Sequence, residues 1–374
     1  MMKKKVLFVA TVLRMHVLVF HLPYMRWFQE HGYEVHLATS NDTGEEVVSV
    51  PFCDQFFDLP FARSPLSRIN LKVYRDLKEI IDREGYALIH CNTPVGGMLG
   101  RLCARVARQK GTKVVYTAHG FHFFTGAPLK NWLMFYPAER FLSRHTDLLI
   151  TINGEDYERA QRFHAKQTAL VSGVGVDLTR FDESVDRNAI RASIGLSPED
   201  QVLICVGEHS VRKNHETVLR AALFLKDVHV LFCGVGEKQP ELEAFVRDHA
   251  MDDRVHFLGF RKDVAQLLMA SDVFVFPSLQ EGLPVSQMEA MAAGLPCVVS
   301  DVRGNADLIR PGDGGYLRRP YDAEGFAEDI ARILSNSDLK RQMGERNLKE
   351  IRKYSLEAVL KEMEALYLKQ LKGH

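Results

Sequence analysis

Short apolar runs alternate with longer amphipathic segments along most of the chain. The runs are rich in Val, Ile and Leu and do not alternate with polar residues, which is typical of parallel strands buried on both faces. They cover 6–10, 33–38, 87–91, 113–117, 148–152 and 168–171 in the first half, and 202–206, 228–232, 255–258, 273–276 and 297–300 in the second. The segments between them, such as 98–108, 215–224 and 239–249, are long enough for crossover helices. The pattern predicts an α/β fold with two Rossmann-like, doubly wound domains.

A charged stretch at 181–200, which contains the turn-forming pair Ser197-Pro198, separates the two halves. We expect this stretch to be the linker between an N-terminal domain at 1–185 and a C-terminal domain at 186–354. The last segment, 355–374, has a helical pattern and can pack on either domain. We expect it to pack back on the N-terminal one.

The composition is that of a globular protein with 374 residues, a length that suits two cores better than one. Lys and Arg together number 48, as do Asp and Glu, so the formal net charge is zero. Since no nucleic-acid motif is present either, we expect no nucleic-acid partner. The six cysteines are scattered without a C-x-x-C pair, so we expect them to be reduced and buried, as in a cytoplasmic chain.

The first residues do not have the pattern of a secretion signal. The apolar run after the basic residues 3–5 is short, ends at Arg14 and lacks a small-residue cleavage site. No stretch approaches the roughly 20 apolar residues of a membrane span. We therefore expect a cytoplasmic location, either free or peripheral at the inner face of the plasma membrane.

A dinucleotide-binding enzyme is the most familiar protein with this pattern of elements, but the glycines it needs are missing. The first strand-like run is followed by residues 11–16, which contain no glycine, and Gly207-Glu208-His209 lacks the spaced glycines as well. A tight turn around a dinucleotide phosphate requires them. The sequence therefore disfavours a dehydrogenase.

The segment 277–296 carries the most informative motif. A buried strand ends near Phe276 and a helix is expected to begin around Pro284, with Gly294 just past its end. The helix start is formed by Gly282, Leu283, Pro284 and Val285. Unpaired amides at a helix start carry partial positive charge and suit a diphosphate. Glu289, further into the helix, can accept hydrogen bonds from a ribose diol, and Glu281 can reach a sugar hydroxyl.

In this frame, Glu281 and Glu289 resemble the E-x7-E motif of the retaining glycosyltransferases with the GT-B fold, specifically those of the family 4 type. The resemblance implies two Rossmann-like domains that face each other across a cleft, with an acceptor-binding domain at 1–185 and a nucleotide-sugar-binding domain at 186–354. The alternative is that Glu281 only caps the helix and Glu289 lies in solvent.

A second segment, 207–216, resembles the family's diphosphate-binding loop, in which an arginine and a lysine hold the donor phosphates. Lys213 matches the lysine, whereas Glu208 stands at the position of the arginine. A carboxylate cannot neutralise phosphate, so either Arg212 supplies the missing charge or Glu208 contacts a donor hydroxyl. The resemblance also places Gly207, Gly234, Phe260 and Arg261 at the donor, with Phe260 or Arg261 as a lid over the base.

Histidines are the candidate polar groups of the N-terminal half. In the resembled family a histidine at the position of His119 faces the reacting sugar, and imidazole can donate or accept a hydrogen bond near neutral pH. The resemblance thus makes His119 a catalytic candidate beside Lys213 and Glu281. His16 and His122 are further acceptor-side candidates, and His21 is a weaker one.

The segment 98–146 is locally basic, with eight Lys or Arg residues and one acidic residue, and seven aromatic residues are interleaved between 121 and 141. Such a surface can hold anionic lipid headgroups or a lipid-linked diphosphate. The alternative is that the aromatic residues belong to the core and the cations to a solvated face.

Within the family, the chain is most similar to enzymes that build bacterial capsule or exopolysaccharide. The resemblance implies a UDP-sugar donor, a polyprenyl-diphosphate-linked or other saccharide acceptor, transfer of a hexosyl or N-acetylhexosaminyl group with retention, and no metal or other cofactor. Peripheral contact with an anionic membrane is a further expectation. Two alternatives remain: an epimerase or phosphorylase on the same fold, and a subunit that binds a sugar nucleotide without catalysis.

Overall fold

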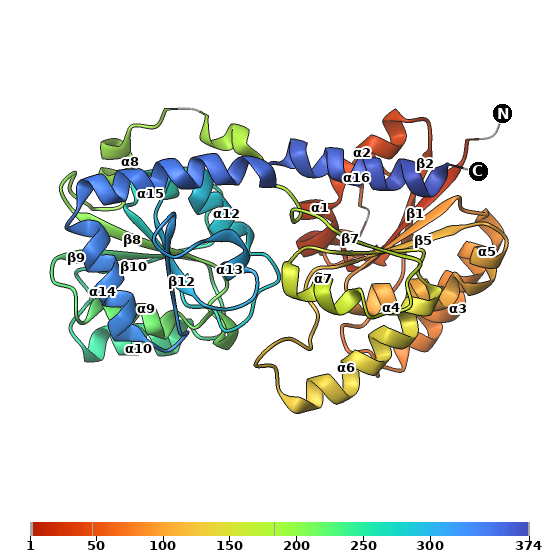
Figure 1. Cartoon of the computed structure of the whole chain (residues 1–374), viewed down its shortest axis with the longest axis horizontal. Coiled ribbons are helices and arrows are strands. Elements are labelled where there is room, and N and C mark those ends of the chain that lie inside the picture. The colour runs from red at the N-terminus through yellow and green to blue at the C-terminus, as the bar shows by residue number, and fades with distance from the viewer. Residues whose placement is uncertain (1–2, 47, 183, 373–374) are drawn as a thin grey trace. The chain divides into compact units, whose positions relative to one another are not determined.

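The computed structural model describes residues 3–46, 48–182 and 184–372, which fold into two α/β units (Figure 1). The first unit contains the chain up to Val174 and again from Val359 onward, and the second contains Gly175–Ala358.

The first unit is built on seven parallel strands in the order β3-β2-β1-β4-β5-β6-β7. They are β1 (Lys5–Val12), β2 (Glu34–Ser40), β3 (Gln55–Asp58), β4 (Leu88–Asn92), β5 (Lys113–Ala118), β6 (Leu148–Thr151) and β7 (Gln167–Leu170). Six of these strands confirm the prediction. The edge strand β3 was not predicted because it is short and begins and ends with exposed polar residues.

Helices cover both faces of this sheet (Figure 1). The helical elements are η1 (Leu13–Val17), α1 (Leu18–Phe20), α2 (Leu22–Glu30), α3 (Ile69–Glu84), α4 (Pro94–Cys103), α5 (Arg105–Gln109), α6 (Leu129–Leu142), η2 (Ser143–His145), α7 (Gly154–Ala160) and α16 (Leu356–Leu371). The helix predicted at 98–108 begins earlier, at Pro94, and is divided at Ala104. One core layer involves α3 and α4, and the other involves α2 and α16.

The last helix, α16, joins the first unit from Val359 onward. Val359, Met363 and Tyr367 are buried against the sheet. The Tyr367 hydroxyl lies 2.8 Å from His90 Nδ1, and Glu362 accepts two hydrogen bonds of 2.9 Å from Ser172. These contacts attach the C-terminal segment to the N-terminal unit.

The second unit has six parallel strands in the order β10-β9-β8-β11-β12-β13. They are β8 (Gln201–Val206), β9 (Val228–Cys233), β10 (Val255–Gly259), β11 (Val273–Phe276), β12 (Cys297–Ser300) and β13 (Gly315–Arg318). Five were predicted, and the two sheets together confirm the doubly wound fold. The edge strand β13 was not predicted as a strand.

The helices of the second unit lie on both faces of its sheet (Figure 1). They are η3 (Leu178–Phe181), α8 (Arg187–Ser193), η4 (Val211–Lys213), α9 (His215–Ala222), α10 (Gln239–Asp248), α11 (Val264–Ala270), α12 (Val285–Ala292), α13 (Asn305–Leu308), α14 (Ala323–Leu334), α15 (Ser337–Glu350) and η5 (Ile351–Tyr354). The helices predicted at 215–224 and 239–249 correspond to α9 and α10.

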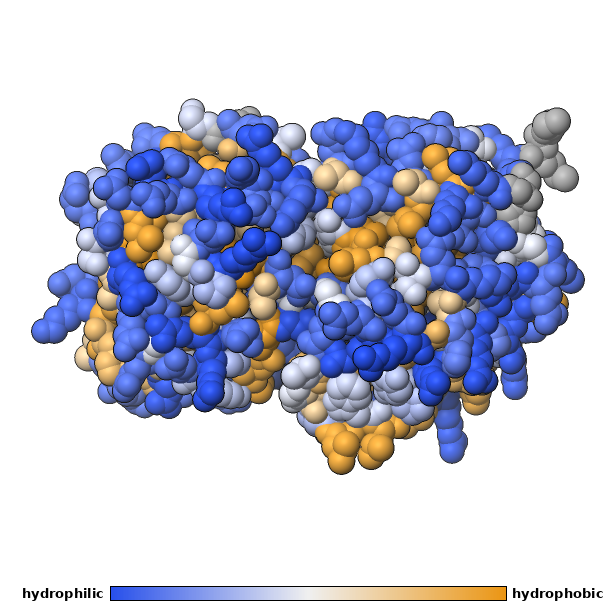
Figure 2. All heavy atoms as spheres, in the orientation of Figure 1, coloured by the Kyte–Doolittle hydropathy of each residue, from blue (hydrophilic) through white to orange (hydrophobic). Residues whose placement is uncertain are grey.

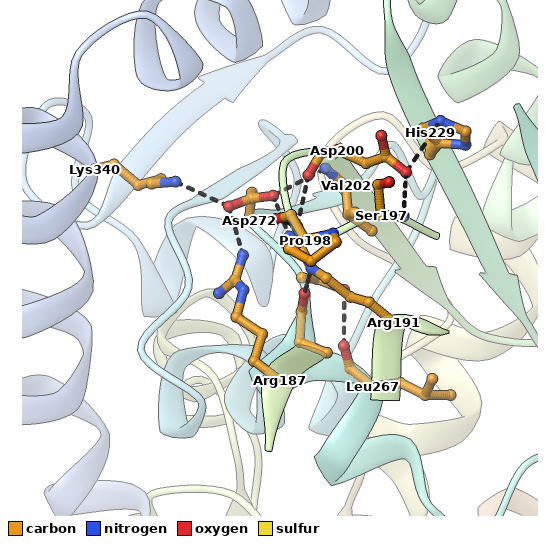
Figure 3. A network of polar contacts seen from close by, with 12 residues as sticks. Arg187, Arg191, Ser197, Pro198, Asp200, Val202, His229, Leu267, Asp272 and Lys340 are labelled. Carbon is orange, nitrogen blue, oxygen red and sulfur yellow. Dashed lines mark hydrogen bonds and ion pairs between the residues drawn. The ribbon is translucent and has the colours of Figure 1, made fainter. Parts of the chain in front are cut away.

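The expectation that 181–200 is a linker was wrong. Within this stretch α8 packs on α11, and Arg191 is 2% exposed. Its guanidinium binds Asp272 at 2.8 Å and donates to the carbonyl oxygens of Ala270, Pro198 and Asp200 (Figure 3). The second unit therefore begins at Gly175, whereas we expected a boundary at 185/186.

Asp272 is the centre of this network. Besides Arg191, it accepts from Arg187 at 2.7 Å, from Lys340 at 2.8 Å and from the Val202 amide at 2.9 Å. Burial raises the pKa of this carboxyl group, but the hydrogen bonds and cations outweigh burial and lower the pKa below its ordinary value. The ionised carboxylate ties α8 and α15 to the amino ends of β8 and β11.

Replacing Arg191 with alanine should therefore destabilise the second unit. The Arg191→Ala variant leaves three carbonyl oxygens without their donor and removes a buried partner of Asp272, so we expect a loss of about 3 kcal/mol in the free energy of unfolding. Urea denaturation of the full chain measures this loss. Arg187→Ala is the matched control, because Arg187 is 41% exposed and its removal should cost about 1 kcal/mol or less. Equal losses in both variants would contradict this account.

Candidate functional site

The loops that follow β8 and β9 touch backbone to backbone at the carboxyl edge of the second sheet. The Gly207 amide donates to Cys233 O at 2.9 Å. A Cβ atom on Gly234 would lie 1.9 Å from Gly207 O, and one on Gly236 would lie 2.3 Å from His209 O. Only glycine at positions 234 and 236 permits this approach, so these glycines shape the edge of the site.

A cluster of charged side chains lies beside these loops. Lys213, at the end of η4, places Nζ 2.8 Å from Glu281 Oε1. Arg212 Nη1 lies 3.0 Å from the same oxygen, and Ser278 Oγ donates to it at 2.5 Å. Because Glu281 and Ser278 follow β11 and Lys213 follows the neighbouring β8, the cluster joins two adjacent strand ends. We call Arg212, Lys213, Ser278 and Glu281 the β8–β11 cluster.

The electrostatics of this cluster suit an anionic ligand. The side chain of Lys213 is 11% exposed, and burial lowers its pKa, while Glu281 acts in the opposite direction. Its Nζ lies 4.5 Å from the centre of the Phe276 ring. Arg212 remains 44% exposed. Two cations thus share one carboxylate, and the positive charge in excess is accessible through Arg212.

The start of α12 lies next to this cluster in the chain. Pro284 is the N-cap rather than the first helical residue, and no side chain caps the helix. This excludes a capping role for Glu281, whose carboxylate binds the two cations instead. The loop is held from outside: Arg303 donates to Glu281 O at 3.0 Å, and a Cβ atom on Gly304 would lie 2.6 Å from Gly282 O. The first amides of α12 have no partner within the helix.

Glu289 lies within α12 and does not face open solvent. Its side chain is 13% exposed and forms an ion pair of 2.5 Å with Arg180, which belongs to η3. Burial raises the pKa of this carboxyl group, and Arg180 lowers it in part. Leu283 is buried, whereas Gly282 and Val285 are half-buried.

The other residues proposed for the donor differ in their surroundings. Glu208 is exposed, and its carboxylate forms no ion pair with any residue that the structure describes. Phe260 is 73% exposed. Arg261 is held by Asp263 through two hydrogen bonds of 2.8 and 2.6 Å, which raise its pKa. Of the two lid candidates, Arg261 is thus held in place by Asp263, whereas the side chain of Phe260 is largely exposed.

The first unit brings three histidines together at the carboxyl edge of its own sheet. His16 lies in η1 after β1, His21 precedes α2, and His119 follows β5. The ring centres are 4.7 Å apart for His16 and His21, 4.7 Å for His16 and His119, and 5.8 Å for His21 and His119. Burial lowers the pKa of His16 to about 4 and lowers those of His21 and His119 well below their ordinary value. We call these residues the histidine trio.

His122 is separate from the trio. Its ring packs against Phe135, with ring centres 4.6 Å apart. It lines an apolar cavity of about 560 Å³ whose walls also include Val12, Met98 and Leu142. This cavity lies wholly within the first unit and is large enough for part of a substrate.

The basic segment 98–146 belongs in part to the core of the first unit. Phe121 and Phe123 are buried, and Arg101 is fully buried, where it binds Glu139 at 2.9 and 3.1 Å. Exposed apolar side chains instead gather on α6, where Figure 2 shows a hydrophobic patch. The α6 patch consists of Leu129, Leu133, Met134 and Phe141. Among the described residues, no helix has both the length and the hydropathy needed to cross a membrane.

Several residues of these clusters were not predicted. Ser278, Arg303 and Arg180 are held against Glu281 or Glu289 by the contacts above. Ser278 could have been found, because it lies two residues past the end of β11. Arg180 is 109 positions from Glu289, so nothing local in the sequence indicates that pair. Five of the six cysteines are buried as expected, and Cys53 is half-buried.

Comparisons with known proteins agree with this architecture. Residues 5–153 match the glycosyl transferase 4-like family, and residues 186–350 match the glycosyl transferases group 1 family. The chain is 39% identical to the putative glycosyltransferase EpsD of Bacillus subtilis, over 98% of this chain and 97% of that protein. It is 30% identical to the UDP-Gal:alpha-D-GlcNAc-diphosphoundecaprenol alpha-1,3-galactosyltransferase of Escherichia coli, over 72% of this chain and 73% of that protein.

Solved structures share the fold across almost the whole chain. Sucrose-phosphate synthase from Thermosynechococcus elongatus has a TM-score of 0.83 at 22% identity and covers 100% of both chains. Anabaena HepE in complex with UDP-glucose has a TM-score of 0.78 at 18% identity, over 98% of this chain and 99% of that one. The chain therefore belongs to the glycosyltransferases, with a glycosyl transferase 4-like N-terminal half, a group 1 C-terminal half and the GT-B fold.

Proposed function

We propose that this glycosyltransferase takes a hexosyl or N-acetylhexosaminyl group from a UDP-sugar and transfers it, with retention, to a lipid-linked saccharide. The β8–β11 cluster beside the start of α12 carries the proposal, because cations and unpaired helix amides together suit a diphosphate. The relative from Escherichia coli is named for a UDP-linked donor and an undecaprenol-linked acceptor, and HepE is described with UDP-glucose.

In the proposed donor complex, Lys213 and Arg212 neutralise the diphosphate. The first-turn amides of α12 point their partial positive charge toward it. Glu289 accepts hydrogen bonds from the ribose diol after exchanging its contact with Arg180. The three side-chain hydrogen bonds to Glu281 all go to Oε1, so its other carboxylate oxygen serves a sugar hydroxyl. Phe260 covers the base.

Transfer follows from this arrangement without a metal at the diphosphate, because fixed cations and helix amides stabilise the leaving group. The bond between the sugar C1 and the phosphate oxygen breaks, and a bond from C1 to the acceptor oxygen forms on the same face. The acceptor hydroxyl proton passes to the departing phosphate oxygen, which keeps the charges balanced. His119 orients the transferred sugar.

The acceptor side of the proposal rests on the first unit. The apolar cavity beside His122 suits the acceptor, and the α6 patch suits peripheral contact with a membrane in which a polyprenyl chain is embedded. Exposed basic residues of the same segment, such as Arg140 and Arg144, favour anionic headgroups. The protein then acts at the inner face of the plasma membrane in the assembly of a surface polysaccharide.

A non-catalytic sugar-nucleotide-binding subunit is the second candidate. It is favoured by Glu208, whose exposed carboxylate stands where the resembled family carries an arginine. Such a subunit would bind UDP but release no transferred product, so binding and transfer need separate measurements.

Nucleotide binding should be selective for UDP and should depend on Lys213. Isothermal titration calorimetry with UDP, GDP and ADP, in buffer containing a chelator, should show binding of UDP only. Lys213→Met keeps the buried stem but removes a charge-assisted bond, so we expect the dissociation constant for UDP to rise roughly 10- to 100-fold. Lys238→Met, at an exposed lysine of the same unit, should leave it unchanged. If the folded wild-type protein bound none of the three nucleotides, the proposed donor site would be refuted.

Glu289 should matter for the ribose but not for the diphosphate. Replacing Glu289 with glutamine removes a charged acceptor for the diol, so we expect UDP binding to weaken roughly tenfold while pyrophosphate binding stays within about threefold of wild type. Competition calorimetry measures both ligands on one preparation. Glu241→Gln, at an exposed position of α10, is the matched control. Equal weakening for the two ligands would show that Glu289 acts on the fold of the site rather than on the ribose.

The α6 patch should matter only when the acceptor lies in a membrane. Leu129→Asp combined with Leu133→Asp removes apolar contact and adds negative charge, so we expect about tenfold slower transfer to a polyprenyl-diphosphate sugar in anionic vesicles. Transfer to a short-chain, water-soluble analogue should be unchanged. The control places the same two charges on α3, at Ile69 and Leu71, which are also exposed.

The same assay separates the proposed enzyme from its alternatives. Product with the anomeric configuration of the donor supports a retaining transferase. Conversion of the UDP-sugar without acceptor would indicate an epimerase. UDP binding with neither reaction, for every UDP-sugar and acceptor offered, would favour the non-catalytic subunit.

A further inference from the structure

The histidine trio has polar atoms that no protein group satisfies. His21 is 2% exposed, and neither of its ring nitrogens has a hydrogen-bond partner among the described residues. Nε2 of His16 and Nε2 of His119 are also buried without a partner there. Buried polar atoms in folded proteins are almost always paired, so four unpaired nitrogens in one place indicate a missing ligand.

His90, a neighbouring buried histidine, has a hydrogen-bond partner for each of its ring nitrogens. Its Nε2 lies 2.8 Å from Thr117 Oγ1, and its Nδ1 lies 2.8 Å from the Tyr367 hydroxyl. The core of the first unit therefore supplies partners to a histidine that serves only the fold. The trio lacks such partners although His21 and His90 pack with ring centres 6.2 Å apart.

The three side chains converge closely enough to share one ion. One ring nitrogen from each of the three lies within 4.8 Å of the others. In a tetrahedral zinc site with Zn–N bonds of about 2.05 Å, neighbouring ring centres are about 5.2 Å apart. The observed separations of 4.7, 4.7 and 5.8 Å bracket that value.

Local structure adds two independent observations. His16 belongs to η1, a π-helical turn, and such turns occur often at functional sites. The turn is anchored by Asp42, which accepts from the Leu13 and Arg14 amides at 2.9 and 2.7 Å. A small cavity of about 10 Å³ lies beside the trio; it is lined in part by His21 and His119, though not by His16, and has room for a single ion or water molecule.

We propose that His16, His21 and His119 bind one divalent transition-metal ion, with zinc as the best match. The trio offers only imidazole nitrogens, which suit Zn²⁺, Co²⁺ and Ni²⁺, whereas Mg²⁺ and Ca²⁺ require oxygen ligands. Three protein ligands leave a fourth tetrahedral position for water or for an oxygen of a substrate, so that His119 would act on the transferred sugar through the ion. The ion links η1 to the loop after β5 and revises our expectation of a metal-free protein. The proposal does not depend on the identity of the sugar donor.

Cobalt is the probe that tests this site directly. The full-length chain, carrying no polyhistidine tag, is freed of metal with a chelator and titrated with Co²⁺. We expect visible absorption bands of tetrahedral cobalt that saturate at one equivalent and disappear when Zn²⁺ is added. Absence of these bands in the folded protein would overturn the proposal and leave a water molecule as the occupant of the cavity.

Substitutions assign the ion to the trio. His16→Gln and His119→Gln, at the two partly exposed positions, should each weaken cobalt binding at least about tenfold, because three ligands are the minimum for such a site. His31→Gln, at an exposed histidine of the same unit, should bind like wild type. Equal binding by all three variants would show adventitious surface binding and refute the site. His21→Gln is added only if circular dichroism shows that it folds.

Calorimetry with UDP on the same metal-free preparations separates the two proposals. Retained UDP binding without a cobalt site would refute the metal site alone. A cobalt site without UDP binding would support the metal site and refute the donor assignment.

Discussion

The pairing of buried carboxylates with cations at the two ends of β11 organises the second unit. At the amino end, Asp272 binds Arg187, Arg191 and Lys340. Past the carboxyl end, Glu281 binds Arg212 and Lys213. A carboxylate removed from water is costly unless cations and donors surround it, so each one dictates where the adjoining segments must lie.

The two clusters differ in how completely their charges are satisfied. Arg191 is almost fully buried and donates to three carbonyl oxygens besides Asp272, which leaves it nothing to offer a ligand. Arg212 is 44% exposed, and among the described residues its guanidinium donates only to Gln280 O and Glu281. The ion pairs of Asp272, at the amino end of β11, therefore stabilise the fold. Those of Glu281, past its carboxyl end, leave Arg212 able to bind a ligand.

Hydrophobic periodicity predicted most of the fold because buried parallel strands have a distinctive sequence pattern. It failed at two of the four edge strands, β3 (Gln-Phe-Phe-Asp) and β13 (Gly-Tyr-Leu-Arg), in which only two of the four residues are apolar. It also failed for the stretch 181–200, whose charged residues indicated a solvent-exposed linker although Arg191 is buried. The partner that permits its burial, Asp272, is 81 positions away and cannot be recognised locally.

The structure brings candidate residues together where their strands are neighbours in the sheet. Lys213 and Glu281 both follow strands, and those strands are neighbours in a doubly wound sheet, so their contact follows from the fold. Glu289 and Arg180 share no such relation. The individual histidines 16 and 119 were identified, but their convergence with His21 depends on the π-helical turn of η1, which has no reliable sequence pattern.

The carboxyl edges of the two sheets differ in electrostatic character, positive in the second unit and neutral at the histidines of the first, and this supports the proposed division of roles between the units. The second unit gathers accessible positive charge, glycine-tight loops and a helix start, all of which favour a diphosphate. In the first unit, the loop after β1 has no glycine, and the nearby imidazoles are neutral because burial lowers their pKa. Neutral imidazoles cannot neutralise the charge of a diphosphate, but they can bind a transition metal or form hydrogen bonds with the hydroxyl groups of a sugar. These physical grounds are independent of family resemblance, and they support our proposal that the donor nucleotide binds to the second unit.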